Sequence, residues 1–230
     1  MYIVEGNIGA GKSTFLRLIQ AHIRAVSIVF EPVAAWQQAT QGESILANFY
    51  KDPQRWAYAM ETASMTTRAQ EHMKVQSHNN YFQIMERSIY SGRYVFAQNG
   101  FDSGFLTAIE WQIYTEWFTF LTQGVCRPPQ GFIYLRVNPE RAFERIQKRQ
   151  RSAESPISLE YIKQIDACHE KFLVNRAHMT PELLSVPILV LNCDREFEND
   201  PAEFKKHSDA IENFIFGDLV PTPRQSHLAL

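Results

Sequence analysis

The sequence has no long apolar run and no excess of charge of one sign. No stretch of about 18 or more apolar residues occurs, so we expect no membrane-spanning helix. The net charge is −2, with 23 basic and 25 acidic residues, which argues against a protein built to bind a nucleic-acid polymer. A strand-like run begins at Met1 and leaves no room for a leader in the sequence as given. We therefore expect a cytoplasmic protein whose partners are small molecules, although an organelle leader already removed would leave no trace.

Cysteine is also scarce. The three cysteines, Cys126, Cys168 and Cys193, lie far apart without a CxxC pair, and the seven histidines show no ligand-like spacing. This pattern indicates a reducing compartment and argues against a disulfide framework and a zinc site. With 230 residues, 45% of them hydrophobic, and with no repeat or linker, the chain is long enough for one α/β domain with a full core.

Short apolar runs recur along the chain. Each is too short for a typical helix and rich in β-branched or aromatic residues, so we interpret them as strands at 1–5, 26–31, 81–86, 132–137 and 186–192. Runs that are apolar on both faces are typical of a buried parallel sheet. Between them, Asp52-Pro53, Asn138-Pro139 and Asp200-Pro201 each place a capping side chain before a proline at the first helical position. The alternation predicts a doubly wound five-stranded α/β domain over 1–216, with a weakly ordered tail at 217–230.

The segment 104–123, GFLTAIEWQIYTEWFTFLTQ, is apolar nearly all round. A helix of this composition is expected to be buried on more than one side. The core of the same chain and the surface of a partner subunit are the two alternatives, and the sequence leaves both open.

The first strand-like run leads into GNIGAGKST. Its residues fit the pattern G-x-x-x-x-G-K followed by Ser or Thr, between a strand that ends at Glu5 and an amphipathic helix that begins at about Lys12. Backbone N–H groups of such a loop surround phosphates, and the helix N-terminus adds partial positive charge. Lys12 would reach the β- and γ-phosphates, and the Ser13 hydroxyl would hold Mg²⁺. The predicted phosphate site consists of Gly6, Asn7, Ile8, Gly9, Ala10, Gly11, Lys12, Ser13 and Thr14.

Charged residues end two further strand-like runs. Glu31 follows one run, and Glu86 and Arg87 follow another. Ligands of open α/β sheets bind at the carboxyl ends of the strands, so we expect these side chains to face the P-loop. Glu31 suits a general base toward a hydroxyl group, Glu86 a magnesium shell, and Arg87 the transferred phosphoryl group. Each pair alone could be a strand-end salt bridge, but three strand ends that meet at one P-loop favour catalysis.

Basic residues concentrate in NPERAFERIQKRQRSAES. On a helix, Arg141, Arg145 and Arg149 follow at i, i+4 spacing, which is unfavourable for like charges unless a polyphosphate binds there. We interpret this helix and the loop after it, about 145–157, as a lid that closes arginines over a phosphate donor. A solvated helix face is the alternative.

These motifs together resemble the deoxyribonucleoside kinases, the family that includes deoxycytidine, deoxyguanosine and insect multisubstrate kinases. The resemblance runs from Tyr2 to about Phe216, through GNIGAGKST, EPVAAW, FYKDPQRWAY, ERSIYSGRYVFA, EWQIYTEW, FIYLRVNPERAFERIQKRQR, SLEYI and VPILVLNCDREFE. It implies a P-loop kinase with an arginine-bearing lid. It also implies ATP with Mg²⁺ as phosphate donor, a deoxynucleoside acceptor, a role in nucleotide salvage, and a homodimer formed through 104–123.

The resemblance also implies roles for individual residues. Glu31 would take the proton of the 5′-hydroxyl, Arg87 would steady the phosphoryl group, and Glu86 would belong to the magnesium shell. Around the acceptor it implies two residues at the sugar 3′-hydroxyl, Tyr50 and Glu154, and three that line the base pocket, Trp36, Met60 and Phe96. Around the donor it implies three lid arginines, Arg145, Arg149 and Arg151, and two residues at the donor's base, Glu196 and Phe197.

Two positions depart from the family pattern. Glu61 stands where the family reads the acceptor base with a glutamine, and an ionised carboxylate only accepts hydrogen bonds. Guanine would complement it with adjacent N1–H and 2-amino donors, leaving Arg68 for O6 or N7. Thymine would turn a carbonyl oxygen toward it, at a cost of roughly 1–3 kcal/mol. A pair between Glu61 and Arg68 is the structural alternative.

Gly92 is the second departure. Family members that take cytosine and purines carry an aspartate there, whereas a small residue enlarges the pocket and resembles the thymidine-accepting members. Those members usually lack the arginine at the position of Arg68, so the two departures point to different acceptor bases. We expect a purine deoxynucleoside, deoxyguanosine first, with thymidine next.

Two other function classes remain open at this point. A nucleoside-monophosphate kinase, such as a thymidylate kinase, would need extra cations to hold the acceptor's own phosphate, and Arg68 or Arg93 could supply them. Such an enzyme would have little use for a carboxylate base at Glu31. A non-catalytic nucleotide-binding protein would not need four residues together: Lys12, Glu31, Glu86 and Arg87.

Overall fold

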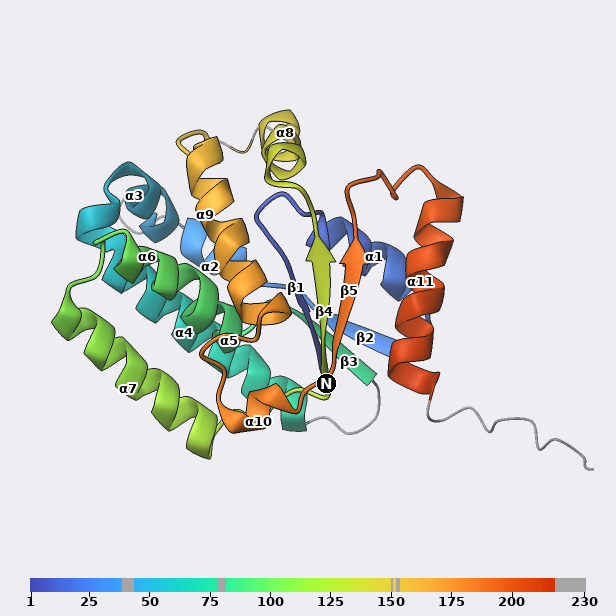
Figure 1. Ribbon diagram of the computed structural model, residues 1–230, viewed down its shortest axis with the longest axis horizontal. Helices are drawn as coiled ribbons and strands as arrows, with labels where there is room; N and C mark the ends of the chain where they lie inside the picture. Colours follow the sequence, from blue (N-terminus) through green and yellow to red (C-terminus); the bar gives the residue numbers. More distant parts are fainter. Residues whose placement is uncertain (39–43, 78–81, 150, 152–153, 218–230) are drawn as a thin grey trace, which may run out of the picture.

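A five-stranded parallel sheet forms the centre of the protein (Figure 1). The computed structural model describes residues 1–38, 44–77, 82–149, 151 and 154–217, so the predicted tail lies outside the described residues after Gly217. The strands are β1 (Tyr2–Glu5), β2 (Val26–Val29), β3 (Phe82–Glu86), β4 (Gly131–Arg136) and β5 (Ile188–Asn192), in the order β2-β3-β1-β4-β5. All five predicted strands and the doubly wound α/β class are confirmed. β2 ends at Val29, so Glu31 lies in the loop after the strand.

Helices cover both faces of the sheet. They are α1 (Lys12–His22), α2 (Val33–Gln37), α3 (Ile45–Lys51), α4 (Pro53–Ser77), α5 (Ile89–Ser91), α6 (Gln98–Asp102), α7 (Ala108–Gly124), α8 (Pro139–Arg149), α9 (Leu159–His169), α10 (Pro181–Leu184) and α11 (Pro201–Phe216), with π-helical segments η1 (Gly92–Ala97) and η3 (Glu170–Val174). Apolar side chains of α4, η1, α7 and η3 form the core on one face, and those of α1, α8 and α11 form it on the other. Figure 1 shows the two layers on either side of the strands.

The three predicted helix starts are confirmed. Asp52 accepts a hydrogen bond from the backbone N–H of Arg55 at 3.2 Å before α4, and Asn138 accepts one from Glu140 at 3.0 Å before α8. Asp200 accepts from the backbone N–H groups of residues 202 and 203 before α11. In each case the carboxylate or amide satisfies a donor of the first turn, while the proline that follows has no N–H to satisfy.

Helix α7 differs from the sequence expectation. It begins at Ala108, because Thr107 caps it in a capping box with Glu110. The core of the chain buries one side of this helix, where Tyr114 and Phe118 lie. Of the two alternatives for this segment, the core of the chain covers only that side, because four apolar residues on the outward side, Ile109, Ile113, Trp117 and Phe120, are 38–71% exposed, and burial by a partner subunit stays a prediction. Within the described residues, no helix has both the length and the apolarity needed to cross a membrane.

The sheet order brings the predicted site residues to one edge. β1 lies between β3 and β4, with Val4 paired with Glu86 and the backbone N–H of Arg87 donating to the Val4 carbonyl at 2.9 Å. The chain therefore leaves β1 through the P-loop directly beside the end of β3. This is the point in a doubly wound sheet where ligands bind.

Candidate active site

The loop between β1 and α1 has the backbone of a phosphate-binding loop. Gly9 and Gly11 have φ values of 80° and 90°, in the left-handed region that favours glycine, and a Cβ at Gly9 would lie 2.2 Å from the Ala142 carbonyl oxygen. Lys12 Nζ donates to the carbonyl oxygens of Gly6 and Asn7 at 3.0 and 2.8 Å. Burial, followed by the charge of Arg87, lowers the pKa of Lys12 to about 7. A phosphate beside this ammonium would favour its charged form.

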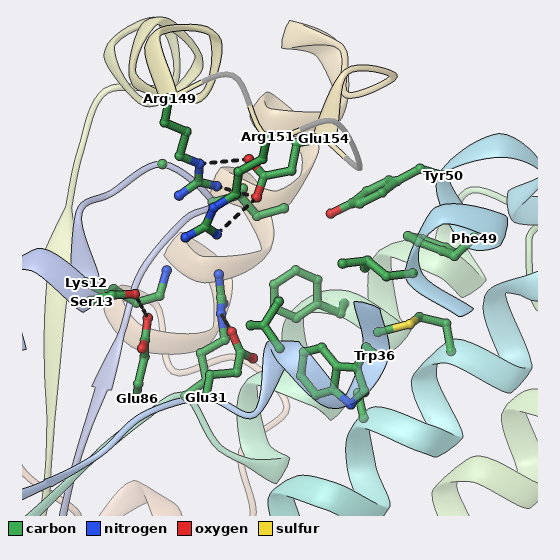
Figure 2. Close-up of a pocket in the computed structure, with 18 of the residues that line it drawn as sticks. Lys12, Ser13, Glu31, Trp36, Phe49, Tyr50, Glu86, Arg149, Arg151 and Glu154 are labelled. Atoms are coloured by element: carbon green, nitrogen blue, oxygen red, sulfur yellow. Dashed lines mark hydrogen bonds and ion pairs between the residues drawn. The ribbon is translucent and has the colours of Figure 1, made fainter. Parts of the chain in front are cut away.

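A cavity of about 340 Å³ opens next to this loop, and its volume suits a small-molecule ligand. Its wall joins the P-loop, the ends of β2 and β3, helices α2, α3 and α4, and the segment after α8 (Figure 2). Most predicted site residues line it: Ile8, Gly9, Gly11, Lys12, Ser13, Thr14, Glu31, Trp36, Tyr50, Met60, Glu61, Arg68, Glu86, Arg87, Phe96, Arg149, Arg151 and Glu154. Gly6, Asn7 and Ala10 are buried behind this wall. The lining also contains six residues to which the sequence analysis assigned no role: Arg17, Val33, Leu46, Phe49, Ser64 and Tyr161.

Glu31 is held between two cations. Arg68 donates to Oε1 from Nε at 3.1 Å and from Nη2 at 2.6 Å, and Arg87 Nε lies 3.3 Å from Oε2. Burial alone would raise the pKa of Glu31, but the charges of Arg68 and Arg87 outweigh it and hold that pKa below its ordinary value. Glu31 is therefore ionised at neutral pH. The lowered pKa also makes it a weaker base than an ordinary carboxylate.

Two oxygen-bearing side chains meet beside the P-loop. The Ser13 hydroxyl donates to Glu86 Oε1 at 2.7 Å, which joins the first turn of α1 to the end of β3 (Figure 2). The pair consists of hard oxygen ligands beside Lys12, as a magnesium site next to phosphates requires.

Aromatic rings form a slot in the part of the cavity where the acceptor is predicted to bind. Trp36 is fixed by a hydrogen bond from its Nε1 to Thr67 Oγ1 at 3.0 Å. The guanidinium of Arg68 lies 5.3 Å from the Trp36 ring centroid and 5.5 Å from that of Phe96. Flat aromatic walls of this kind suit a planar nucleobase.

The far end of this slot is polar and buried. Burial raises the pKa of Glu61 to about 7, although the charge of Arg68 opposes the shift. Glu61 Oε2, Arg68 Nη1 and the Tyr114 hydroxyl are buried and have no hydrogen-bond partner among the described residues. The alternative in which Arg68 pairs with Glu61 is wrong, because Arg68 forms its ion pair with Glu31. Gly92 lies beside this group, since a Cβ there would be 3.2 Å from both Arg68 Nη1 and the Tyr114 hydroxyl.

Two of the arginines predicted for the lid converge on one carboxylate. Arg149 donates to both oxygens of Glu154 at 2.8 and 2.5 Å, and Arg151 Nη1 lies 3.5 Å from Glu154 Oε1. Figure 2 shows this group above the cavity, with the ring of Tyr50 beside it. Residues 150 and 152–153 of the predicted lid lie outside the described residues.

The remaining predicted donor residues lie outside the cavity lining. The Arg145 guanidinium donates to the Cys193 carbonyl at 2.9 Å, with longer contacts to neighbouring carbonyls, and so ties α8 to the loop after β5. Phe197 is 4% exposed and packs edge-on against Phe15, with ring centroids 5.3 Å apart. The Glu196 carboxylate accepts backbone N–H groups of its own loop. The role of Arg145 in the lid and the roles of Glu196 and Phe197 at the donor's base stay predictions.

Comparison with known proteins shows the family of this chain. The sequence profile of the family described as deoxynucleoside kinase matches residues 2–216. The mitochondrial deoxyguanosine kinase of Xenopus laevis is 34% identical, over 93% of this chain and 89% of that protein. Deoxycytidine kinase 2 of Gallus gallus is 34% identical, over 92% of this chain and 89% of that protein. The mitochondrial thymidine kinase 2 of Homo sapiens is 32% identical, over 90% of this chain and 76% of that protein. The chain therefore belongs to the deoxynucleoside kinase family and is an ATP-dependent deoxyribonucleoside kinase.

Proposed function

We propose that the protein transfers the γ-phosphoryl group of ATP to the 5′-hydroxyl of a deoxyribonucleoside, with Glu31 as general base and deoxyguanosine as the preferred acceptor. The observation that carries the proposal is that Glu31, Lys12 and Arg87 line the same cavity as the aromatic slot. A hydroxyl bound between the slot and the P-loop would therefore meet both the base and the phosphate site.

The transfer needs few protein groups. The 5′-hydroxyl oxygen bonds to the γ-phosphorus as the bond to the β-phosphate oxygen breaks, ADP leaves, and Glu31 accepts the hydroxyl proton. Lys12 and Arg87 stabilise the charge on the transferred group and the leaving phosphates. Trp36 and Phe96 hold the base, and Tyr50 with Glu154 holds the sugar 3′-hydroxyl, so the 5′-oxygen is oriented toward ATP.

Ser13 and Glu86 would hold Mg²⁺, which uses one or two protein oxygens together with phosphates and water. When bound with ATP, the ion neutralises charge on the β- and γ-phosphates. Excess chelator should abolish turnover, and Ser13→Ala should raise the Mg²⁺ concentration needed for half-maximal activity. Full activity of the Ser13→Ala enzyme at the wild-type Mg²⁺ requirement would contradict this assignment.

A Glu31→Gln variant tests the role of the base. The amide keeps the shape of Glu31 and one of its two acceptor oxygens, but its N–H₂ group cannot accept from an arginine and the side chain cannot take the proton. General-base catalysis contributes about 10²–10⁴-fold, so kcat should fall by that factor while ATP affinity stays near the wild-type value. Turnover near the wild-type rate would remove Glu31 from the mechanism.

Glu61 supports the preference for deoxyguanosine. When ionised, this carboxylate is acceptor-only, and guanine turns two adjacent donors toward such a group. The test is turnover with ATP and Mg²⁺ against deoxyguanosine, deoxyadenosine, deoxycytidine, thymidine and dTMP, scored as nucleotide product and ADP. A leading rate with thymidine would show that the space at Gly92 outweighs Glu61. Turnover of dTMP alone would favour the monophosphate kinase alternative.

The outward side of α7 supports a homodimer. Ile109, Trp117 and Phe120 leave an apolar helix face uncovered by the described residues, and a second copy could bury it. A cytoplasmic location is also proposed, since the free, buried cysteines fit a reducing compartment. Fluorescent tagging at the C-terminus would test the location, and mitochondrial signal would contradict it.

A further inference from the structure

A buried carboxyl group immediately precedes the P-loop. Glu5 is the last residue of β1, where it pairs with Tyr134 of β4, and it is 0% exposed. Its Oε2 is buried without a hydrogen-bond partner among the described residues. Burial raises the pKa of Glu5, although the charge of Arg87 opposes the shift. Because a buried carboxyl group with an unpaired oxygen costs free energy, stability alone gives no reason for Glu5 at this position.

The other oxygen of this carboxyl group holds the residue that follows Arg87. The Ser88 hydroxyl donates to Glu5 Oε1 at 2.7 Å, across 83 positions of the chain. The same hydroxyl oxygen accepts the backbone N–H groups of residues 90 and 91 at 3.2 and 3.3 Å, so Ser88 caps α5 and joins it to the end of β1. Ser88 is also 0% exposed, so water is excluded from this hydrogen bond. The bond therefore fixes the chain directly after Arg87.

Arg87 needs this support because its backbone is strained. Its φ is 62°, in the left-handed region that residues other than glycine rarely adopt. Before it, Glu86 pairs with Val4 in the sheet, and the N–H of Arg87 donates to the Val4 carbonyl at 2.9 Å. After it, the hydrogen bond from Ser88 ties the chain to Glu5. The end of β1 thus holds the chain on both sides of this strained residue.

The side chain on this backbone lies in the cavity, where Arg87 Nε is 3.3 Å from Glu31 Oε2 and the guanidinium is 4.6 Å from the Phe96 ring centroid. We propose that Glu5 is a positioning residue, which acts through Ser88 to hold Arg87 at the transferred phosphoryl group. The proposal rests on the proposed function, in which Arg87 stabilises that group. Without an acceptor oxygen at Glu5, the chain at Ser88 is released, the backbone at Arg87 relaxes, and the guanidinium moves away from the phosphate site.

Glu5→Leu and Glu5→Gln separate the hydrogen bond from the space that the side chain fills. Leucine has a similar volume but no acceptor, whereas glutamine keeps an oxygen for the Ser88 hydroxyl. A displacement of about 1 Å can cost on the order of 10²-fold, so kcat of Glu5→Leu should fall by about 10- to 100-fold. The KM values for ATP and nucleoside should stay within about twofold of the wild type, because the charge that Arg87 stabilises develops in the transition state. Glu5→Gln should restore most of kcat.

The decisive readout is a double-mutant cycle with Arg87→Met. If Glu5 acts through Arg87, Glu5→Leu should not lower kcat further once the guanidinium is absent. Glu203→Leu is the matched control, since Glu203 is a carboxylate of α11 that is 8% exposed and lies outside the cavity lining. It should leave kcat at the value of the parent enzyme in both backgrounds. Each enzyme is assayed below its own melting temperature, so that unfolded protein does not contribute to the loss.

Two results would overturn the role of Glu5: a wild-type kcat for Glu5→Leu, or an equal loss of kcat on this change in the wild-type and Arg87→Met backgrounds. If Glu5→Leu does not fold, Ser88→Ala removes the donor of the same hydrogen bond and enters the same cycle. If Arg87→Met is too slow to measure, equal losses of kcat in Glu5→Leu and Glu5→Gln would show that the hydrogen bond to Ser88 does not matter. Wild-type turnover of Arg87→Met would instead refute the role of Arg87 in the proposed function.

Discussion

Replacement of Glu61 by glutamine should reduce the proposed preference for deoxyguanosine. Glu61 is 6% exposed, and its Oε2 has no partner among the described residues, so a substrate donor is the natural partner. The ionised carboxylate can accept both N1–H and 2-amino donors of guanine, whereas an amide turns its own N–H₂ toward one of them. Loss of one hydrogen bond to a charged group costs about 2–3 kcal/mol, so kcat/KM for deoxyguanosine should fall by about 30- to 150-fold.

The same carboxyl group predicts a pH-dependent preference. Burial raises the pKa of Glu61 to about 7. Above that pH the group is ionised and complements guanine, and below it the group carries a proton that faces the guanine donors. The ratio of kcat/KM for deoxyguanosine to that for thymidine should therefore rise about tenfold from pH 6 to pH 8. Glu31 acts on both acceptors, so its titration cancels from this ratio.

The assay is steady-state kinetics with both nucleosides at saturating ATP, for the wild type, Glu61→Gln and Glu71→Gln. Glu71 lies on the same helix and pairs with Lys74 near the surface, so Glu71→Gln makes the same charge change outside the cavity. The Glu61→Gln enzyme should show a ratio that is independent of pH, and Glu71→Gln should match the wild type. A ratio that varies equally with pH in all three enzymes would refute the role of Glu61 in base recognition.

Three further outcomes follow from the geometry. Trp117→Glu should lower the affinity of the proposed dimer by at least tenfold in sedimentation velocity, because a charge would replace a half-exposed indole in the apolar face of α7. An unchanged dissociation constant would show that this face is not the interface. Gly9→Ala should weaken ATP binding in calorimetry, since its Cβ would lie 2.2 Å from the Ala142 carbonyl, and wild-type affinity would contradict the loop geometry. Thr107→Ala should lower the free energy of unfolding by about 1 kcal/mol in urea titration, whereas Thr107→Ser should restore most of it.

The parts of the fold that depend on neighbours in the chain could be predicted from sequence. Asp52, Asn138 and Asp200 cap helices because a side-chain oxygen reaches N–H groups only two or three residues away. The P-loop follows from the local backbone freedom of its glycines. The strand-end rule placed Glu31 and Glu86 at the same edge before any contact was known, because parallel strands expose their carboxyl ends on one side.

The partners of the buried charges were decided by the tertiary structure. Glu61 and Glu31 both lie within reach of Arg68 in principle, and the sequence could not rank them. The fold brings Glu31 to 2.6 Å of Arg68 across 37 positions, while Glu61 Oε2 is left without a partner among the described residues. The exposed apolar side of α7 could likewise not be predicted from the sequence, because apolar composition does not say which surface will cover a helix. Capping and turn preferences act over a few bonds, whereas ion pairs and burial depend on which groups the whole fold brings within a few ångströms.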